Sequence, residues 1–260
     1  GEVQYVSPNY IRYYGRDDVG MISLFTFPLF SAMFGKGMRF PNAGEFAVSR
    51  SLFHNFLSDN DISASALSYE EQYAAVALAK GASVQDVWLG EKMHKKNPPV
   101  TTLDAYFKVA AGIFFEQIDK HKDWWDTKAG NADIEGIGFN GPPDLDAARL
   151  ANDIVSDGVE SDSDEWFKNF REGYQNDKDY YKNTFSDLLF LFERLNTSRS
   201  GELIFTSKEW ASVVFAFLKR YLETQDLIEK QNIPLRLKPF FAARVLAFAN
   251  EVRDRKNLTF

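Results

Sequence analysis

A long polar segment that begins with two tryptophans holds the residues best suited to ligand recognition. Its candidate binding residues carry aromatic, amide and carboxylate groups: Trp124, Trp125, Asp126, Phe139 and Asn140. Aromatic faces beside such polar groups suit the recognition of sugars, peptides or a partner surface. The structural alternative is that the tryptophans fill the core where a helix ends, while the polar residues only make turns.

The segment itself, residues 123–144, is the longest stretch of the chain without helical periodicity. Loops of that length are uncommon inside compact domains, and those that occur are often functional or mobile. We therefore expect the segment to lie at the surface beside a concavity, with no helix longer than one turn. Within it, GIGFNG at residues 136–141 lacks the lysine and the preceding strand of a phosphate-binding loop, so it is interpreted as a turn.

Histidine and the common catalytic motifs give no sign of a metal centre or a cofactor. The three histidines are widely separated, and none belongs to an H-E-x-x-H motif: His54, His94 and His121. Nucleophile-elbow, Walker A and dinucleotide-binding motifs are missing from the sequence. We therefore expect no cofactor and no bound metal. The three imidazoles are expected to be exposed, or partly buried with their hydrogen bonds made.

The acidic run at residues 157–165 offers oxygen ligands of the kind that calcium prefers. Its spacing does not fit the calcium-binding helix-loop-helix pattern, because no register places a glycine sixth and a glutamate twelfth. The run is therefore interpreted as a solvated linker. Its last acids, Asp164 and Glu165, stand just before Trp166, where they would stabilise the positive amino end of the next helix.

Composition excludes several classes of function. The 260 residues include 30 Lys and Arg against 37 Asp and Glu, a net charge of -7, which argues against nucleic-acid binding. The absence of cysteine excludes disulfides, thiol nucleophiles and cysteine zinc sites. The absence of cysteine does not determine the compartment. A chain that starts at Gly1 is expected after removal of an export signal or after trimming at a domain boundary. If no export signal was removed, we expect a cytoplasmic protein.

Residues 21–34 form the most apolar window, but they do not predict a transmembrane helix. The window is shorter than the roughly 20 apolar residues that a spanning helix needs, and it contains Pro28. A buried strand or a broken core helix is the interpretation we favour. An interfacial, lipid-contacting segment is the alternative.

One strongly marked helix, predicted over residues 206–230, organises the carboxyl-terminal half. Thr206 and Glu209 have the spacing of a capping box, and Phe205 and Trp210 that of a hydrophobic staple. Apolar residues then recur at the three-and-four spacing of one helical face. Because Phe215 would widen that face, we expect this helix to be buried on more than one side.

The remaining periodic segments complete a mainly α chain of about nine helices. They lie near residues 45–57, 68–80, 83–88, 101–122, 144–155, 166–174, 181–195 and 241–252, the last of them entered through Pro234 and Pro239. A short strand or hairpin is expected near the amino terminus, where Val, Ile and Tyr are frequent. We predict one compact domain over residues 1–260, with residues 1–44 as an extended or irregular segment packed on it.

Two functions from different classes fit these observations. The first is a non-enzymatic helical binding or interaction protein, which on one hypothesis is exported. It would hold a partner, or an apolar or sugar-like ligand, at the loop that contains the tryptophans and glycines. The second is a hydrolase that uses carboxylates brought together by the fold, with or without a metal. Two carboxylates converging in a cleft would favour the enzyme, and a dry apolar groove would favour binding.

Overall fold

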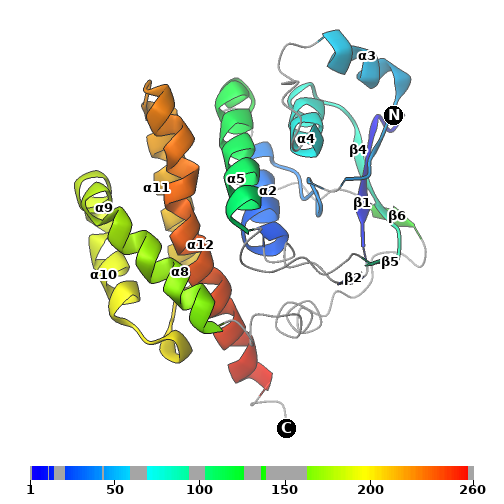
Figure 1. Ribbon diagram of the computed structural model, residues 1–260. Coiled ribbons are helices and arrows are strands. Elements are labelled where there is room, and N and C mark those ends of the chain that lie inside the picture. Colours follow the sequence, from blue (N-terminus) through cyan, green and yellow to red (C-terminus); the bar gives the residue numbers. More distant parts are fainter. Residues whose placement is uncertain are drawn as a thin grey trace. The chain divides into compact units, whose positions relative to one another are not determined.

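The computed structural model describes residues 2–10, 12–14, 21–42, 44–58, 69–93, 103–125, 136–138 and 163–256 (Figure 1). These residues form ten α-helices and six short strands, so the predicted mainly α class is confirmed. The chain divides into two compact units: residues 1–96 with 109–146, and residues 97–108 with 147–260. Each unit is described by itself, and the single domain stays a prediction.

The first unit is built on a small, mostly parallel sheet. Strand β1 (Tyr5–Asn9) pairs in parallel with β4 (Val84–Trp88), and β4 pairs in parallel with β6 (Gly136–Gly138). The short β3 (Ala47–Val48) pairs antiparallel with β1, which gives the order β3-β1-β4-β6. Parallel strands need long crossover connections, and here helices of the unit lie in those connections.

The parallel pair continues beyond a short interruption. Strand β2 (Arg12–Tyr14) pairs in parallel with β5 (Glu91–Met93), and the register is unchanged: 84 minus 5 and 91 minus 12 both give 79. The interruption falls at Gly90, whose φ of 84° is a backbone conformation that glycine adopts readily. The two pairs therefore keep the same register but belong to separate sheets, so β1 and β4 end at Asn9 and Trp88.

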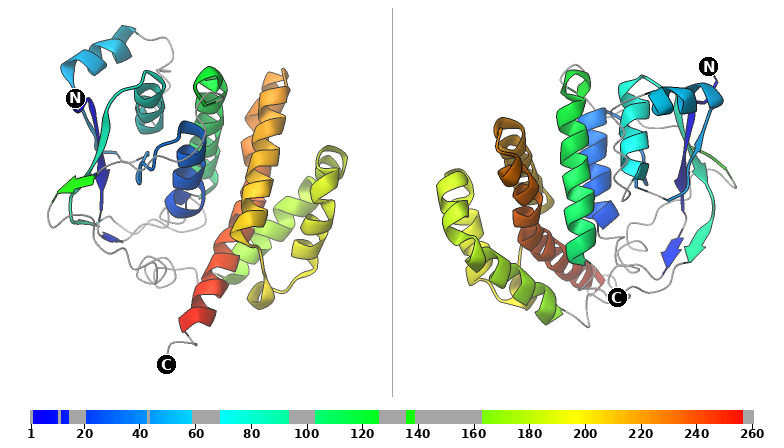
Figure 2. Two further views of the ribbon diagram at one scale, coloured as in Figure 1. Left: turned by 180° about the vertical axis from the view of Figure 1, so that it is seen from behind. Right: turned by 45° about the horizontal axis from the view of Figure 1, so that its top comes forward.

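Helices of the first unit cover one face of this sheet (Figures 1 and 2). They are α2 (Phe27–Phe34), α3 (Arg50–Ser58), α4 (Tyr69–Ala79), the part of α5 (Leu103–Lys120) from Val109 onward, and α6 (Lys122–Trp125). Helices α2 and α4 lie beside the sheet in both views. Helix α4 ends one residue before the predicted end at residue 80, and Gly81, at φ 71°, terminates its backbone hydrogen-bonding pattern.

The most apolar window is a buried helix, which confirms the broken-helix interpretation of residues 21–34. A wider π-type turn (Ile22–Thr26) leads directly into α2. Pro28 is accommodated in the first turn of α2, where no backbone donor is required. Phe25 and Phe30 both contact Phe114 of α5, with ring centroids 6.4 and 5.6 Å away.

The helix predicted over residues 83–88 is wrong, because this segment is strand β4. Its apolar residues Val84, Val87 and Trp88 have helical spacing, yet Val84 and Trp88 pair with Tyr5 and Asn9 of β1. Pairing with a strand nearly 80 residues away outweighs a short local pattern. The strand predicted near the amino terminus is confirmed as β1.

The second unit is helical in its described part. After the first residues of α5, it contains α8 (Ser163–Asn176), α9 (Lys178–Thr184), α10 (Leu189–Thr197), α11 (Ser207–Glu223) and α12 (Leu227–Lys256). Single 3-10 turns at Ser186–Leu188 and Ser200–Glu202 precede α10 and α11. The predicted helix over residues 144–155 lies outside the described residues.

The predicted start of α11 is confirmed in atomic detail. The Glu209 amide donates to Thr206 Oγ1 at 3.2 Å, and the Thr206 amide donates to Glu209 Oε2 at 2.9 Å. The Phe205 and Trp210 rings meet edge to face at 5.9 Å, as a hydrophobic staple should. Because Phe215 is 44% exposed, however, the expectation that the helix is buried on more than one side is wrong.

Helix α11 also ends earlier than predicted, at Glu223 rather than Lys230. Thr224 adopts an extended backbone conformation, and Asp226 Oδ1 then accepts from the Ile228 amide at 2.9 Å, which begins α12. Arg220 of α11 holds Glu229 of α12 through two hydrogen bonds of 2.8 and 2.7 Å. The two helices are therefore joined by a tight, hydrogen-bonded turn.

A cluster of aromatic rings from five helices forms the core of this unit: Phe170, Tyr174, Tyr181, Phe192, Phe217 and Phe240 are all fully buried. The Tyr174 and Tyr181 rings stack at 5.5 Å, and Phe192 lies 4.2 Å from Phe240. Aromatic pairs of this kind stabilise by about 0.5–1.5 kcal/mol beyond their buried area. The abundance of phenylalanine is thus used largely for packing.

Two predicted helix boundaries in this unit are wrong. The helix expected over residues 181–195 breaks at Phe185, whose backbone leaves the helical region at φ -126° and ψ 53°. In addition, Pro234 and Pro239 lie inside α12 and do not precede it. The Pro239 ring packs against Gly173 of α8, where an added Cβ would come within 2.5 Å of that ring. This close approach lets α8 pack along α12 (Figure 1).

In the part of the chain that the structure describes, no helix is both long enough and apolar enough to cross a bilayer.

We predict that Phe217→Ala lowers the free energy of unfolding by about 3–5 kcal/mol, because it empties a fully buried space. The matched control on the same helix is Phe215→Ala, which should cost about 0.5 kcal/mol because that ring is partly exposed. Denaturant unfolding of the two variants measures both values. Equal costs would show that α11 is not packed as described.

Candidate functional site

The predicted binding loop lies largely outside the described residues. Trp124 and Trp125 belong to the one-turn helix α6, and the side chain of Trp124 is partly buried. Asp126, Phe139 and Asn140 lie outside the described residues. Ligand binding at this group of five therefore stays a prediction.

One part of the loop is not the turn that the sequence predicted. Gly136–Gly138 forms β6, which pairs in parallel with Asp86, Val87 and Trp88 of β4. Glycine is rare in strands, so its local signal was that of a turn.

The histidines and the acidic run are described only in part, and within that part the buried Nε2 atom of His121 lacks a well-formed hydrogen bond, unlike the satisfied imidazole that we expected. His54 is exposed on α3, while Glu116, the acid near His121, pairs with Lys120 at 2.7 Å. His94 lies outside the described residues. Asp164 and Glu165 occupy the first turn of α8, close to its positive end. Within the described ranges, no three His, Asp or Glu side chains are grouped as metal ligands.

A different group of residues stands out on the sheet of the first unit. Ser7 pairs with Asp86, and Asn9 pairs with Trp88, across the parallel β1–β4 ladder. Paired residues point to the same face of a sheet, so the four side chains share one face near the carboxyl ends of both strands. We call Ser7, Asn9, Asp86 and Trp88 the strand-end group. Ligands of parallel α/β sheets commonly bind outside such carboxyl ends.

The strand-end group faces the helices of its unit. Tyr5, two residues before Ser7 on the same face, is buried, and its pKa is raised by that burial and then by the negative charges of Glu70 and Glu71 on α4. The strand-end group is itself buried, with exposed fractions of 1, 3, 4 and 5% in chain order. Three polar side chains and the indole N–H of Trp88 thus lie under helices, where apolar groups would be usual.

Each member of the strand-end group has a buried polar atom that lacks a well-formed hydrogen bond to any described atom. Two are acceptors, Asn9 Oδ1 and Asp86 Oδ1, and two can donate, Ser7 Oγ and Trp88 Nε1. The Asn9 amide donates to the other carboxylate oxygen, Asp86 Oδ2, at 3.5 Å. A buried polar atom without a partner costs about 1–3 kcal/mol, so the four atoms lower stability unless water or a ligand meets them.

Burial raises the pKa of Asp86 from its ordinary 3.8 to about 7. A hydrogen bond from the Arg39 backbone, the positive Arg39 side chain, and loose hydrogen bonds from the Ser7 and Asn9 side chains all act in the opposite direction, but they do not offset the burial. Ser7 Oγ therefore lies close to Asp86 without good hydrogen-bonding geometry. The pKa of Arg39 is in turn lowered by its own partial burial. A carboxyl group that titrates near neutrality can donate or accept a proton, which suits acid–base chemistry as well as binding.

Sequence reasoning missed the strand-end group because its members lie nearly 80 residues apart in two pieces. Ser7 and Asn9 are ordinary polar residues of an amino-terminal strand, and Asp86 stood in a segment predicted as a helix. One signal was available. Tyr5, Ser7 and Asn9 occupy alternate positions, as residues on one face of a strand do, and a strand predicted over 84–88 would have placed Asp86 on a buried face.

We predict that Asp86→Asn flattens the dependence of stability on pH. The folded protein holds the Asp86 proton more tightly than the unfolded chain, so its stability should fall as pH rises from about 4 to about 7 and then level off. The variant should lose that slope and be more stable at pH 8, by on the order of 2–4 kcal/mol. Urea unfolding across this pH range tests it, with the exposed Glu2→Gln as control. An unchanged slope would rule out a buried, titrating Asp86.

No protein-family model matches the chain, and no curated protein sequence matches it. The functional proposal therefore depends on the geometry of the described residues.

Proposed function

We propose that this protein binds a small, neutral, hydrogen-bonding molecule, of the hydroxyl- or amide-bearing kind, at the strand-end group of its sheet. The single observation that supports the proposal is the set of four buried polar atoms without well-formed hydrogen bonds on one face of β1 and β4. Natural proteins pair nearly all such atoms, with protein, water or ligand.

The chemistry of the four atoms determines the class of ligand. Asn9 Oδ1 and Asp86 Oδ1 need donors, whereas Trp88 Nε1 can only donate and Ser7 Oγ can do either. A hydroxyl or primary amide group both donates and accepts, so a single small molecule can satisfy both kinds of atom. Sugar-like compounds, which the sequence also suggested, belong to this class.

Charged ligands fit the strand-end group less well. A cation would meet the indole N–H of Trp88, which cannot act as a ligand to it, and the positive Arg39 that influences Asp86. An anion would meet the Asp86 carboxylate, which is ionised in part of the molecules at neutral pH. Because unpaired charge is costly in a buried place, a neutral molecule is favoured.

A hydrolase is the second candidate, and the raised pKa of Asp86 is the observation in its favour. Glycosidase-type hydrolysis needs two carboxyl groups, about 5–10 Å apart, with different roles. The strand-end group contributes one carboxyl, so binding without chemistry is proposed first. Turnover of a p-nitrophenyl glycoside that Asp86→Asn abolishes would favour the enzyme instead.

The Trp88 indole N–H gives a direct test of binding. The chain has five tryptophans, and Trp88→Phe would assign the Trp88 signal in a ¹⁵N–¹H spectrum. We predict that ribose or acetamide shifts this signal in a saturable way, because the ligand accepts from Nε1. Acetate, guanidinium and Mg²⁺ should leave it in place.

Two variants separate binding at the strand-end group from a general effect. Asn9→Ala removes one acceptor and should weaken the shift, whereas Val87→Ala changes a β4 side chain that alternates to the opposite face and should not. The proposal fails if no neutral probe moves the Trp88 signal, or if the charged probes move it equally.

A further inference from the structure

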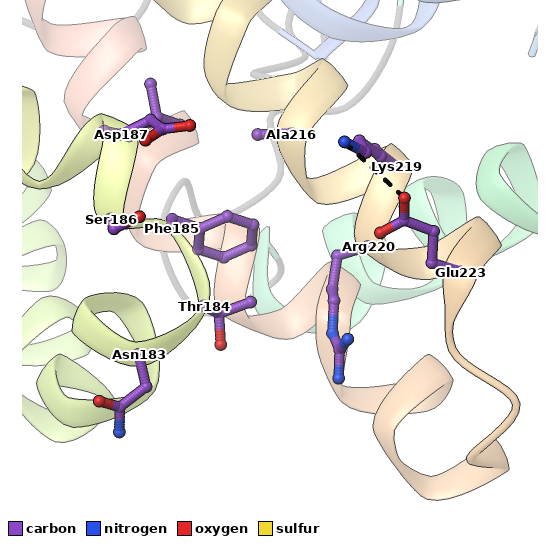
Figure 3. A pocket seen from close by; sticks show the side chains of 10 residues that line it. Asn183, Thr184, Phe185, Ser186, Asp187, Ala216, Lys219, Arg220 and Glu223 are labelled. Carbon is purple, nitrogen blue, oxygen red and sulfur yellow. Dashed lines mark ion pairs between the residues drawn. The ribbon is translucent and has the colours of Figure 1, made fainter.

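We infer that the helical unit contains a separate site for a small zwitterion with an apolar part, such as a free amino acid. The site is a pocket of about 370 Å³ between the α9–α10 break and the last turns of α11 (Figure 3). Small-molecule pockets commonly have volumes of roughly 300–1,000 Å³. This inference goes beyond the proposed function, because its residues belong to the other unit.

The pocket exists because the helix breaks at Phe185. The backbone there leaves the helical conformation, and the Phe185 ring turns in to stack on Phe217 of α11 at 4.4 Å. That buried stack fixes one wall, while Ala216 supplies a small residue on the facing helix. In Figure 3, the Phe185 ring and Ala216 lie between the charged side chains of the pocket. The Phe185–Phe217 stack therefore holds this part of the wall in place before any ligand binds.

Opposite charges stand on the two walls of the pocket. Figure 3 shows Asp187 on the side of the break and Lys219 on the side of α11. In the described part of the chain, the structure gives Asp187 no ion pair, while Lys219 lies 3.8 Å from Glu223, with both side chains more than half exposed. An exposed pair at that distance is weak, so Lys219 can exchange Glu223 for a ligand carboxylate.

The second cation of the pocket is already neutralised. Arg220 donates twice to Glu229 at 2.8 and 2.7 Å, and the pKa of Arg220 is raised by that hydrogen bonding. Arg220 therefore forms part of the pocket wall, but its ion pair with Glu229 leaves little net charge there. The effective charges are therefore Lys219 and the acids Asp187 and Glu223, which leaves one positive and at least one negative partner for a ligand.

These features together select an amino-acid-like zwitterion. A ligand ammonium can pair with Asp187, its carboxylate with Lys219, and its apolar side chain can lie on Phe185 and Ala216. Neutral polar groups complete the walls at Asn183, Thr184 and Ser186. A ligand with only a carboxylate would leave Asp187 unpaired, and a ligand with only an ammonium would gain nothing from Lys219. A ligand with two charges of the same sign would meet repulsion from one wall.

Binding of leucine to the full chain, measured by titration calorimetry or NMR, tests this inference. The single-charge analogues are 4-methylpentanoate, which lacks the ammonium, and 3-methylbutylamine, which lacks the carboxylate. We expect leucine to bind and each analogue to bind about tenfold more weakly or worse. The leucine affinity should fall several-fold between low and high salt, because the charges are exposed and screened.

Matched variants locate the two charges. Asp187→Asn should remove the advantage of leucine over 4-methylpentanoate, and Lys219→Met its advantage over 3-methylbutylamine. Lys208→Met and Asp179→Asn change exposed charges of α11 and α9 outside the pocket and should bind leucine normally. All four positions are exposed, so folding should be preserved. Equal binding of leucine and its analogues, no binding at millimolar leucine, or unaltered binding by both pocket variants would overturn the inference.

Discussion

The parallel pairing of β1 with β4 is the constraint on which the first unit depends. Two parallel neighbours cannot be joined by a tight turn, so the chain between Asn9 and Val84 must cross over, and it does so through α2, α3 and α4. The same pairing sets Ser7 against Asp86 and Asn9 against Trp88. A shift of one residue would turn Asp86 to the other face, so the register that builds the sheet also builds the site.

The strand-end group lowers the stability of the fold that contains it. An apolar quartet under the helices would pack without orphaned donors and acceptors, and a carboxyl with an ordinary pKa would not oppose folding at neutral pH. Polar residues retained at such a cost usually serve binding or catalysis. In the helical unit the core is filled largely by stacked rings such as Tyr174 and Tyr181, and the pocket is at the surface.

Local signals predicted what local contacts determine. The capping box of Thr206 and Glu209 and the staple of Phe205 and Trp210 involve neighbours in sequence, and both were predictable. The α class followed from periodicity in the same way. Strand β4 was not predictable from Val84, Val87 and Trp88 alone, because the partner that makes it a strand is β1.

The candidate sites depend on tertiary contacts that periodicity does not report. The raised pKa of Asp86 arises because folding buries its carboxyl group beside Asn9. The pocket of the helical unit forms because the helix breaks at Phe185, whose ring stacks on Phe217. Trp124 was correctly noticed as a residue at a helix end, but its predicted role in binding depends on loop residues outside the described part of the chain.

A high-resolution crystal structure of the full chain, grown at neutral pH, tests the central claim most directly. We predict ordered density, from water or a small molecule, within hydrogen-bonding distance of both Asp86 Oδ1 and Trp88 Nε1, with Asn9 and Ser7 turned toward it. The account is contradicted if Asp86 Oδ1 and Trp88 Nε1 are both bonded to protein atoms, with no density beside them.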